Sequence, residues 1–110
     1  MTREEAIKKH RELWHWIADE TRRNCRLVFK HENPDVAKEK PYNDCWLCEY
    51  AICHKTTNFN HCTRCPIDWG VMTCMRKGSP YRELTLGNFL YKEYANLADR
   101  IAELPEKGDE

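Results

Sequence analysis

The segment TREEAIKKHRELWHWIADETRRNCRLV, residues 2–28, indicates a helical fold, because it contains no glycine or proline and repeats its apolar positions with a helical period. Thr2 is followed three residues later by Glu5, a pairing typical of the capping box that starts a helix. Side chains three and four residues apart share one face of a helix. The sequence therefore predicts a helix over residues 2–28 that fades near residues 25–29, with a buried face made of Ile7, His10, Leu13, Trp14, Ile17, Ala18 and Thr21.

A second helix is predicted over residues 85–104, where apolar side chains again recur at helical spacing. Ser79 or Thr85 is expected to cap this helix, and Pro105 ends it, because proline cannot continue a helix. Residues 30–43 contain two prolines and many charges, and we predict that they form a loop. The apolar seam of the second helix consists of Leu86, Leu90, Tyr94, Leu97, Ile101 and Leu104.

The composition indicates one folded domain over residues 1–110 with a small aliphatic core. The chain has 110 residues and a formal net charge of zero, but only 19 of its residues are Leu, Ile, Val or Phe. The balanced charge and the four tryptophans argue against a disordered chain and against a polycation that coats nucleic acid. We expect a mostly α-helical fold in which the two long helices pack together along their apolar stripes, and which needs a further source of stability.

The expected location follows from the absence of apolar segments. The opening residues contain no apolar run that could serve as a signal peptide, and no stretch is long and apolar enough to span a bilayer. A cytoplasmic location without membrane contact is therefore expected, and disulfides are rare in that compartment.

Six of the seven cysteines lie between residues 45 and 74, which indicates a metal site. The central motif is Cys45-x2-Cys48-x13-Cys62-x2-Cys65, whose two short turns can face one another and supply the four thiolates that a tetrahedral Zn²⁺ ion accepts. We predict an irregular four-cysteine zinc-knuckle lobe over residues 44–78, inserted between the helices. Four thiolates leave no open position for water, so the predicted zinc is structural rather than catalytic.

Other ligand choices remain open in this lobe. Cys74 can replace Cys62 or Cys65 as a ligand. The histidines that adjoin cysteines are expected at the surface or in packing, and Cys25 and Cys53 are expected to pack as small apolar side chains. An iron–sulfur cluster is the rival metal interpretation, although the closely spaced cysteines of ferredoxins are missing.

The sequence contains none of the common catalytic motifs. It lacks a phosphate-binding loop, a GxSxG nucleophile motif and an HExxH zinc motif, so no enzyme activity is predicted. A zinc-ribbon-like nucleic-acid-binding protein is the alternative function, but residues 83–110 hold seven acidic and only three basic residues, which disfavours it. The basic side chains of residues 61–82 are better explained as compensation for the negative charge of a zinc ion with four thiolates. A redox-active thiol protein is the third hypothesis, and it requires thiols that react in the metal-loaded chain.

Trp16 is the candidate partner-binding residue, because it lies off the apolar stripe of the first helix. Exposed tryptophans often anchor protein contacts, since they bury a large area on binding. The competing interpretation is that Trp16 packs over the flank of Leu13 or against the zinc lobe.

Five pieces of the chain carry a resemblance to a known group of proteins. They are EEAIKKHRELWHWIADET at 4–21, CWLCEYA at 45–51, CTRCPIDW at 62–69, Cys74 with SPY at 79–81, and IAELP at 101–105. These pieces resemble small cysteine-rich proteins encoded by phages and prophages of Gram-positive bacteria. The resemblance implies a metal-binding accessory protein of a mobile element, and no catalytic residue is carried over with it. We therefore predict a non-enzymatic zinc-binding accessory or regulatory protein of phage type that acts through contacts with an unidentified protein, in the cytoplasm of the bacterial host if it is phage-encoded.

Overall fold

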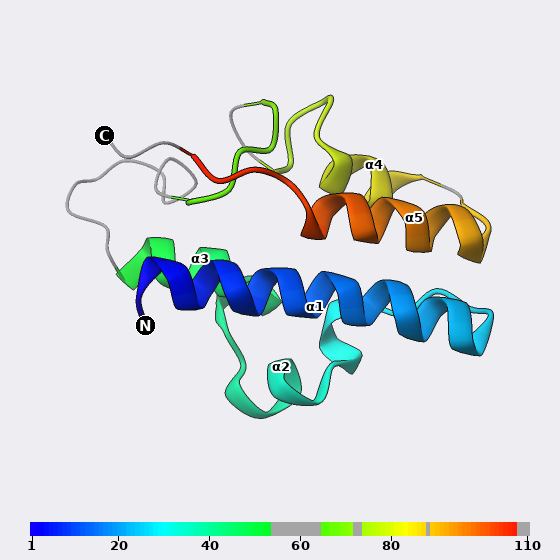
Figure 1. Ribbon diagram of the computed structural model, residues 1–110, viewed down its shortest axis with the longest axis horizontal. Helices are drawn as coiled ribbons and strands as arrows, with labels where there is room; N and C mark the ends of the chain where they lie inside the picture. Colours follow the sequence, from blue (N-terminus) through cyan, green and yellow to red (C-terminus); the bar gives the residue numbers. More distant parts are fainter. Residues whose placement is uncertain (54–64, 72–73, 88, 108–110) are drawn as a thin grey trace.

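The computed structural model describes residues 1–53, 65–71, 74–87 and 89–107. Its helices are α1 (Arg3–Asn24), η1 (Lys30–Glu32), α2 (Pro34–Glu39), η2 (Tyr42–Asp44), α3 (Trp46–Cys53), α4 (Pro80–Leu86) and α5 (Tyr91–Ala102), where η marks a 3₁₀-helix (Figure 1). Extended pairing within these described ranges is confined to one antiparallel bridge, between Ile67 and Glu106. The mostly helical fold predicted from the sequence is confirmed. None of the helices formed by the described residues has the length and apolar character needed to cross a bilayer.

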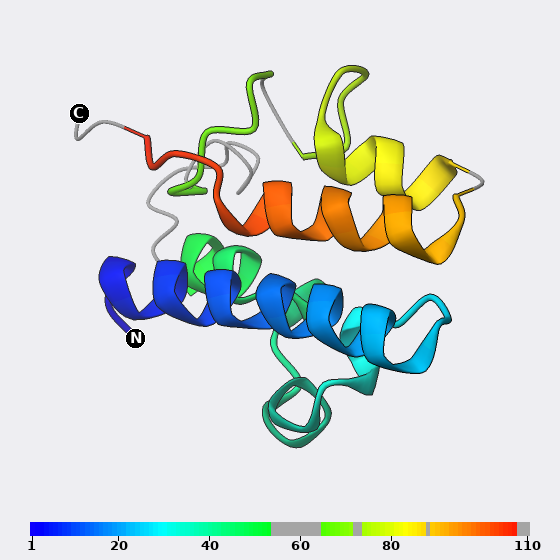
Figure 2. The ribbon, with the colours of Figure 1, turned by 45° about the vertical axis from the view of Figure 1, so that its right-hand side comes forward.

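α1 and α5 run antiparallel and pack along their apolar stripes, so the first and last helices form the centre of the molecule (Figures 1 and 2). Trp14 and Ile17 from α1, and Tyr94 and Ile101 from α5, are all buried. Burial of a large apolar side chain contributes about 1.5–3 kcal/mol to the stability of the folded state. The prediction that two long helices pack together is therefore confirmed, and their contact supplies much of the core.

The ends of α1 are set by its caps. Thr2 Oγ1 accepts a backbone N–H of the first turn at 3.1 Å, as the sequence predicts. The helix ends at Asn24, because Cys25 adopts a left-handed conformation with φ 53°. This end lies at the start of the stretch 25–29 where the sequence predicts that the helix fades. The chain then folds back, and the backbone N–H of Val28 donates to Thr21 Oγ1 at 3.3 Å. Val28 is consequently buried by the returning chain and not by a further turn of helix.

The prediction of one continuous helix over residues 85–104 is wrong, because the chain turns at Gly87 and forms two helices, α4 and α5. A Cβ atom at Gly87 would lie 2.6 Å from the carbonyl oxygen of Glu83, so this close approach requires glycine. Ser79, and not Thr85, caps α4, and its Oγ accepts the backbone N–H of Tyr81 at 3.2 Å.

The turn at Gly87 moves the first part of the predicted seam to the surface. Leu86 is 69% exposed and Leu90 is 73% exposed. The three seam residues that lie within α5 remain in the core, as predicted. The molecule therefore shows two large apolar side chains at the turn between α4 and α5, where the sequence predicts burial.

The prediction of a loop over residues 30–43 is also wrong in part, because this stretch contains η1, α2 and most of η2. Pro34 occupies the first turn of α2, where a missing N–H costs nothing, so this proline starts a helix. The Asn33 side chain caps α2 by accepting backbone N–H groups at 2.9 and 3.2 Å. Val36 anchors α2 in the core, on the side of α1 away from α5 (Figure 2).

A short extended stretch lies beside the C-terminal end of α5. The backbone N–H groups of Asp68 and Lys107 donate to the carbonyl oxygens of Pro105 and Pro66, both at 2.8 Å. Ile67, between these bonds, is completely buried. This pairing fixes the chain that directly follows the second predicted cysteine knuckle.

Candidate metal-binding site

The first predicted knuckle lies at the start of α3. Cys45 directly precedes this helix, and Cys48 lies in its first turn. The Sγ atom of Cys45 accepts the backbone N–H of Cys48 at 3.4 Å, so the two residues form the tight turn that the motif predicts. Asn43 and Asp44, immediately before them, have left-handed backbone conformations with φ of 58° and 52°. Short polar side chains tolerate this conformation, which aims the chain into α3.

Cys65 reaches the site from residues 65–71. Its Sγ atom accepts the indole N–H of Trp69 at 3.5 Å. The buried Trp69 ring meets the imidazole of His10 edge to face, with the ring centroids 5.8 Å apart. Cys65 is therefore held by a side chain packed on α1 as well as by the backbone pairing with residues 105–107.

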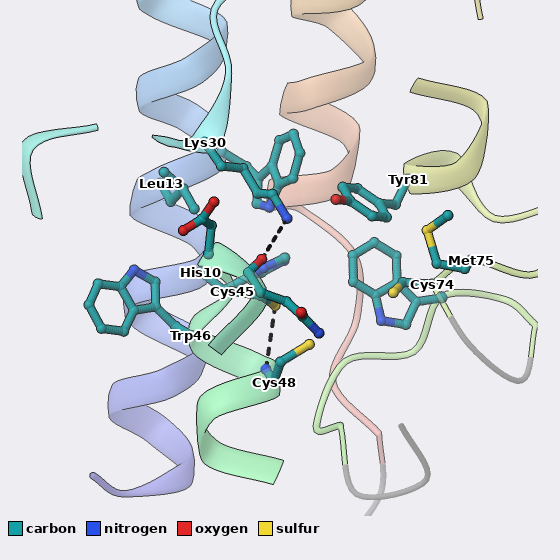
Figure 3. Close-up of a pocket in the computed structure, with 13 residues that line it drawn as sticks. His10, Leu13, Lys30, Cys45, Trp46, Cys48, Cys74, Met75 and Tyr81 are labelled. Atoms are coloured by element: carbon teal, nitrogen blue, oxygen red, sulfur yellow. Dashed lines mark hydrogen bonds between the residues drawn. The ribbon is translucent and has the colours of Figure 1, made fainter. Parts of the chain in front are cut away.

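A pocket of about 370 Å³ opens beside these thiols (Figure 3). Cys45 and Cys48 line it from the start of α3, and Cys74 lines it from the segment that precedes α4. Figure 3 shows Cys48 and Cys74 facing the same cavity from these two elements. The remaining lining residues are His10, Leu13, Trp14, Lys30, Asn43, Asp44, Trp46, Trp69, Met75 and Tyr81.

The thiols influence one another's protonation. A hydrogen bond with the Cys48 thiol lowers the pKa of Cys45 to about 6, against the effect of burial and with help from the charge of Lys30. The pKa of Cys48 is raised by the same hydrogen bond, by burial, and by neighbouring thiols that include Cys74 and Cys65. The lowered pKa of Cys45 favours its thiolate, which is the form that binds a metal, and the raised pKa of Cys48 favours its thiol.

Three of the four predicted ligands lie in one region, and the fourth lies outside the described residues. Cys45, Cys48 and Cys65 interact electrostatically, whereas Cys62 belongs to the undescribed stretch 54–64. Cys74, the predicted alternate ligand, joins the first two at the pocket. In the part of the chain that the structure describes, no three His, Cys, Asp or Glu side chains are arranged so that they could hold a metal ion. An ion held by these thiols therefore requires them to draw closer together.

The prediction that Cys25 packs in the interior is wrong. Cys25 is exposed in the turn after α1, because the helix ends one residue earlier and leaves it outside the packed face. The side chain of Cys53, the other cysteine predicted to pack, lies outside the described part of the structure.

Lys30 and Tyr81 belong to the pocket, although no pattern in the sequence links them to the cysteines. The Nζ atom of Lys30 donates to the carbonyl oxygen of Asn43 at 3.0 Å and lies 4.8 Å from the centroid of the Tyr81 ring. Lys30 comes from the predicted loop and Tyr81 from α4, so only the tertiary structure brings them to the thiols.

His10 was predicted on the buried face of the first helix, and this is confirmed, since it is 2% exposed. Its Nε2 atom lies 3.3 Å from the carbonyl oxygen of Ile101 and donates to it, because a carbonyl oxygen can only accept. Burial lowers the pKa of His10 to about 3, so the imidazole is neutral. The helical period identifies the burial of His10, but it does not reveal that this face borders the thiol pocket.

Trp16 is partly buried and packs against core side chains. It lines two surface grooves, one of about 590 Å³ beside Arg11 and Glu106, and one of about 160 Å³ beside Trp46. The Trp16 ring therefore packs against the core and is partly accessible, and its role in binding a partner stays a prediction.

Comparisons with protein-family models, with curated proteins and with solved structures found no match to this chain.

Proposed function

We propose that this chain is a zinc-binding accessory protein of phage type, without a catalytic role, that acts through protein–protein contacts in the bacterial cytoplasm. The observation that carries the proposal is the proximity of thiols from three separate segments. Cys45 and Cys48 at the start of α3 and Cys74 before α4 line one pocket, and Cys65 from residues 65–71 acts electrostatically on Cys48. Reduced cysteines gathered in this way are typical of metal ligands. Four thiolates saturate a zinc ion and leave no place for a reactive water, so the proposed metal is structural.

The proposed ligands are Cys45, Cys48 and Cys65, with Cys74 as the fourth. Cys74 is supported because it lines the pocket together with Cys45 and Cys48. Cys62 is the alternative fourth ligand, from the spacing of the second CxxC motif. The zinc would hold together the pieces of chain that form the predicted lobe over residues 44–78, and structural zinc contributes about 10 kcal/mol or more of apparent binding free energy to such sites.

The test of the metal is zinc content and its dependence on Cys48. The purified chain is expected to contain one zinc ion by elemental analysis, and Cys48→Ser should lower both the zinc content and the melting temperature, because a thiolate ligand is lost. Cys25→Ser removes an exposed thiol outside the pocket, so it is the matched control and should keep its zinc. Iron in place of zinc, or no metal after gentle purification, overturns the proposal. Cys62→Ser and Cys74→Ser, compared side by side, decide the fourth ligand.

We propose two separate contact places, namely Trp16, as the sequence predicts, and the two leucines of the turn between α4 and α5. Leu86 and Leu90 are the most exposed of the large apolar side chains that the structure describes. Apolar side chains left in water at one turn are typical of a surface that another protein covers. The test is capture of proteins from a bacterial lysate, identified by mass spectrometry, with wild type and with a Leu86→Ser/Leu90→Ser double variant. A protein retained by wild type and lost with the double variant supports this surface, and identical capture by both contradicts it.

Thiol–disulfide exchange at Cys45 and Cys48 is a second candidate function. The observation in its favour is the N–H···S bond from Cys48 to Cys45 at the first turn of α3, since a CxxC turn at the start of a helix also occurs in redox proteins. Alkylation of the zinc-loaded chain separates the two functions. Protected thiols favour the structural zinc site, and rapid labelling of Cys45 in the loaded chain favours exchange.

A further inference from the structure

Lys30 is the single lysine or arginine among the described residues that line the thiol pocket. It lies in η1, and Figure 3 shows its side chain pointing into the cavity on the side of Cys45. The ammonium group is held from two directions, by the carbonyl oxygen of Asn43 at 3.0 Å and by the ring of Tyr81, whose centroid is 4.8 Å away. A positive charge is therefore fixed at the edge of the thiols, and the ring face and the carbonyl dipole both favour a cation there.

The ammonium stays charged in this partly buried place. Burial by itself lowers the pKa of Lys30, but the oxygen of Tyr81 and the thiols of Cys45 and Cys48 outweigh it, so the pKa is raised. The Asn43 carbonyl and the Tyr81 ring therefore hold a cation in the pocket that Cys45 and Cys48 also line, and a cation so placed attracts the negative charge of thiolate ligands. Asp44 also lines the pocket, so a test must measure the effect of its carboxylate separately from the effect of the thiols.

A zinc ion with four thiolates has a formal charge of about −2, from one divalent cation and four anions. Such a charge beside aromatic walls is costly unless a cation lies close to it. The basic residues of 61–82 were expected to supply that cation. Within the described part of this segment, Arg76, Lys77 and Arg82 are not among the residues that line the pocket, and Arg64 lies outside the described residues. The cation that lines the pocket is instead Lys30, from a distant part of the sequence, while the charge of Lys107 acts on Cys65.

We propose that Lys30 is the fixed counter-charge of the zinc–thiolate site and sets the affinity of that site for the metal. The inference rests on the zinc function proposed above. Lys30 is a positioning residue and not a ligand, because a charged ammonium has no lone pair to give to a metal. Groups that act on the ligands of a metal site typically change its affinity by about 10- to 100-fold when they are removed.

The test is a competition titration of the metal-free, reduced chain with Zn²⁺ and a chromophoric chelator. Lys30→Gln keeps a donor for the Asn43 carbonyl but removes the charge, and it is expected to weaken Zn²⁺ binding by about 10- to 100-fold. Lys30→Arg keeps the charge and should restore most of the affinity. Lys38→Gln makes the same chemical change at an exposed position of α2, so it is the matched control and should bind as wild type does. Asp44→Asn removes the other charged neighbour and is expected to bind Zn²⁺ at least as tightly as wild type.

The absorption spectrum of the Co²⁺-loaded chain gives a second measurement, which would not change if the role of Lys30 were purely structural. With Co²⁺ in place of Zn²⁺, the thiolate-to-metal charge-transfer band should shift in Lys30→Gln and stay in place in Lys38→Gln, because the band reports the electron density on the sulfur atoms. Equal affinity of wild type and Lys30→Gln overturns the proposal. An equal loss in Lys30→Gln and Lys30→Arg also overturns it, because the role would then be one of shape. If wild type itself binds neither metal, the proposed zinc function fails first and this inference with it.

A third measurement needs no variant and therefore does not depend on whether a variant folds. Acetic anhydride labels lysine amines in the wild-type chain, and mass spectrometry gives the rate at each position. Labelling of Lys30 relative to Lys38 should slow when zinc is added, because the loaded site holds the ammonium more strongly. A ratio that does not change with zinc contradicts the proposal.

Discussion

The neutral, buried His10 makes the stability of this protein depend on pH in a calculable way. The pKa of the His10 imidazole is lowered by burial to about 3 in the folded chain, from 6.5 when the side chain is free. Below pH 6.5 the unfolded chain binds a proton at this position and the folded chain does not, so the free energy of unfolding falls as the pH falls. The loss begins near pH 6.5 and is complete near pH 3. Each pH unit within this window removes about 1.4 kcal/mol, so the contribution of His10 at pH 4.5 is smaller by about 3 kcal/mol than at pH 7.

The assay is urea unfolding from pH 7 to pH 4.5, with wild type and His10→Gln measured side by side. Other groups, including the cysteine thiols, titrate in both proteins and cancel in the difference between them. His10→Gln should have a lower free energy of unfolding than wild type at pH 7. The difference between the two proteins should shrink by about 1.4 kcal/mol for each pH unit below pH 6.5. Thr21→Ala is the matched control, because it removes a buried hydrogen bond of α1 and has no ionisable group. The difference in unfolding free energy between Thr21→Ala and wild type should stay constant with pH. A constant difference for His10→Gln as well would show that the folded chain does not keep His10 neutral.

Three further substitutions test the fold and the surface by urea or thermal unfolding. Ser79→Ala removes the cap of α4 and should cost about 1 kcal/mol, and an unchanged stability would show that the Ser79–Tyr81 bond contributes nothing. Gly87→Ala should cost about 1–3 kcal/mol, because the new Cβ meets the carbonyl oxygen of Glu83, and a stabilised variant would contradict the tight turn. Trp16→Ala should cost less than the roughly 3 kcal/mol of a fully buried tryptophan, and a larger loss would argue against a role in partner contact.

The parts of the fold that follow a local period are predictable from the sequence. The stripe that contains Ile7, Trp14 and Ile17 is buried as its spacing predicts, because the period of a helix directly determines which side chains share a face. The C-terminal ends of the helices are not predictable in this way. α1 stops because a cysteine adopts a left-handed conformation, and nothing in the chemistry of Cys25 announces that. The break at Gly87 depends on a close approach that only the folded backbone reveals.

The candidate site likewise has a local part that the sequence predicts and a long-range part that it does not. The turn formed by Cys45 and Cys48 is local, so the CxxC spacing is enough to predict it. The approach of Cys74 and Lys30 joins segments that are far apart in sequence, and their meeting depends on how α1, α4 and the chain before α3 pack. The sequence contains Cys74 as one of several possible ligands, but it holds no sign that a lysine near residue 30 shares the same pocket.

The packing of α5 on α1 affects the chain while it is being made. Synthesis proceeds from the N-terminus, so the stripe of α1 that carries Trp14 and Ile17 exists long before Ile101 is added to cover it. During that interval the nascent helix presents its largest apolar side chains to water. Exposed apolar surface of this kind is what chaperones bind and what drives aggregation of incomplete chains. A ribosome that stalls before α5 is complete would therefore leave a fragment that cannot bury its first helix.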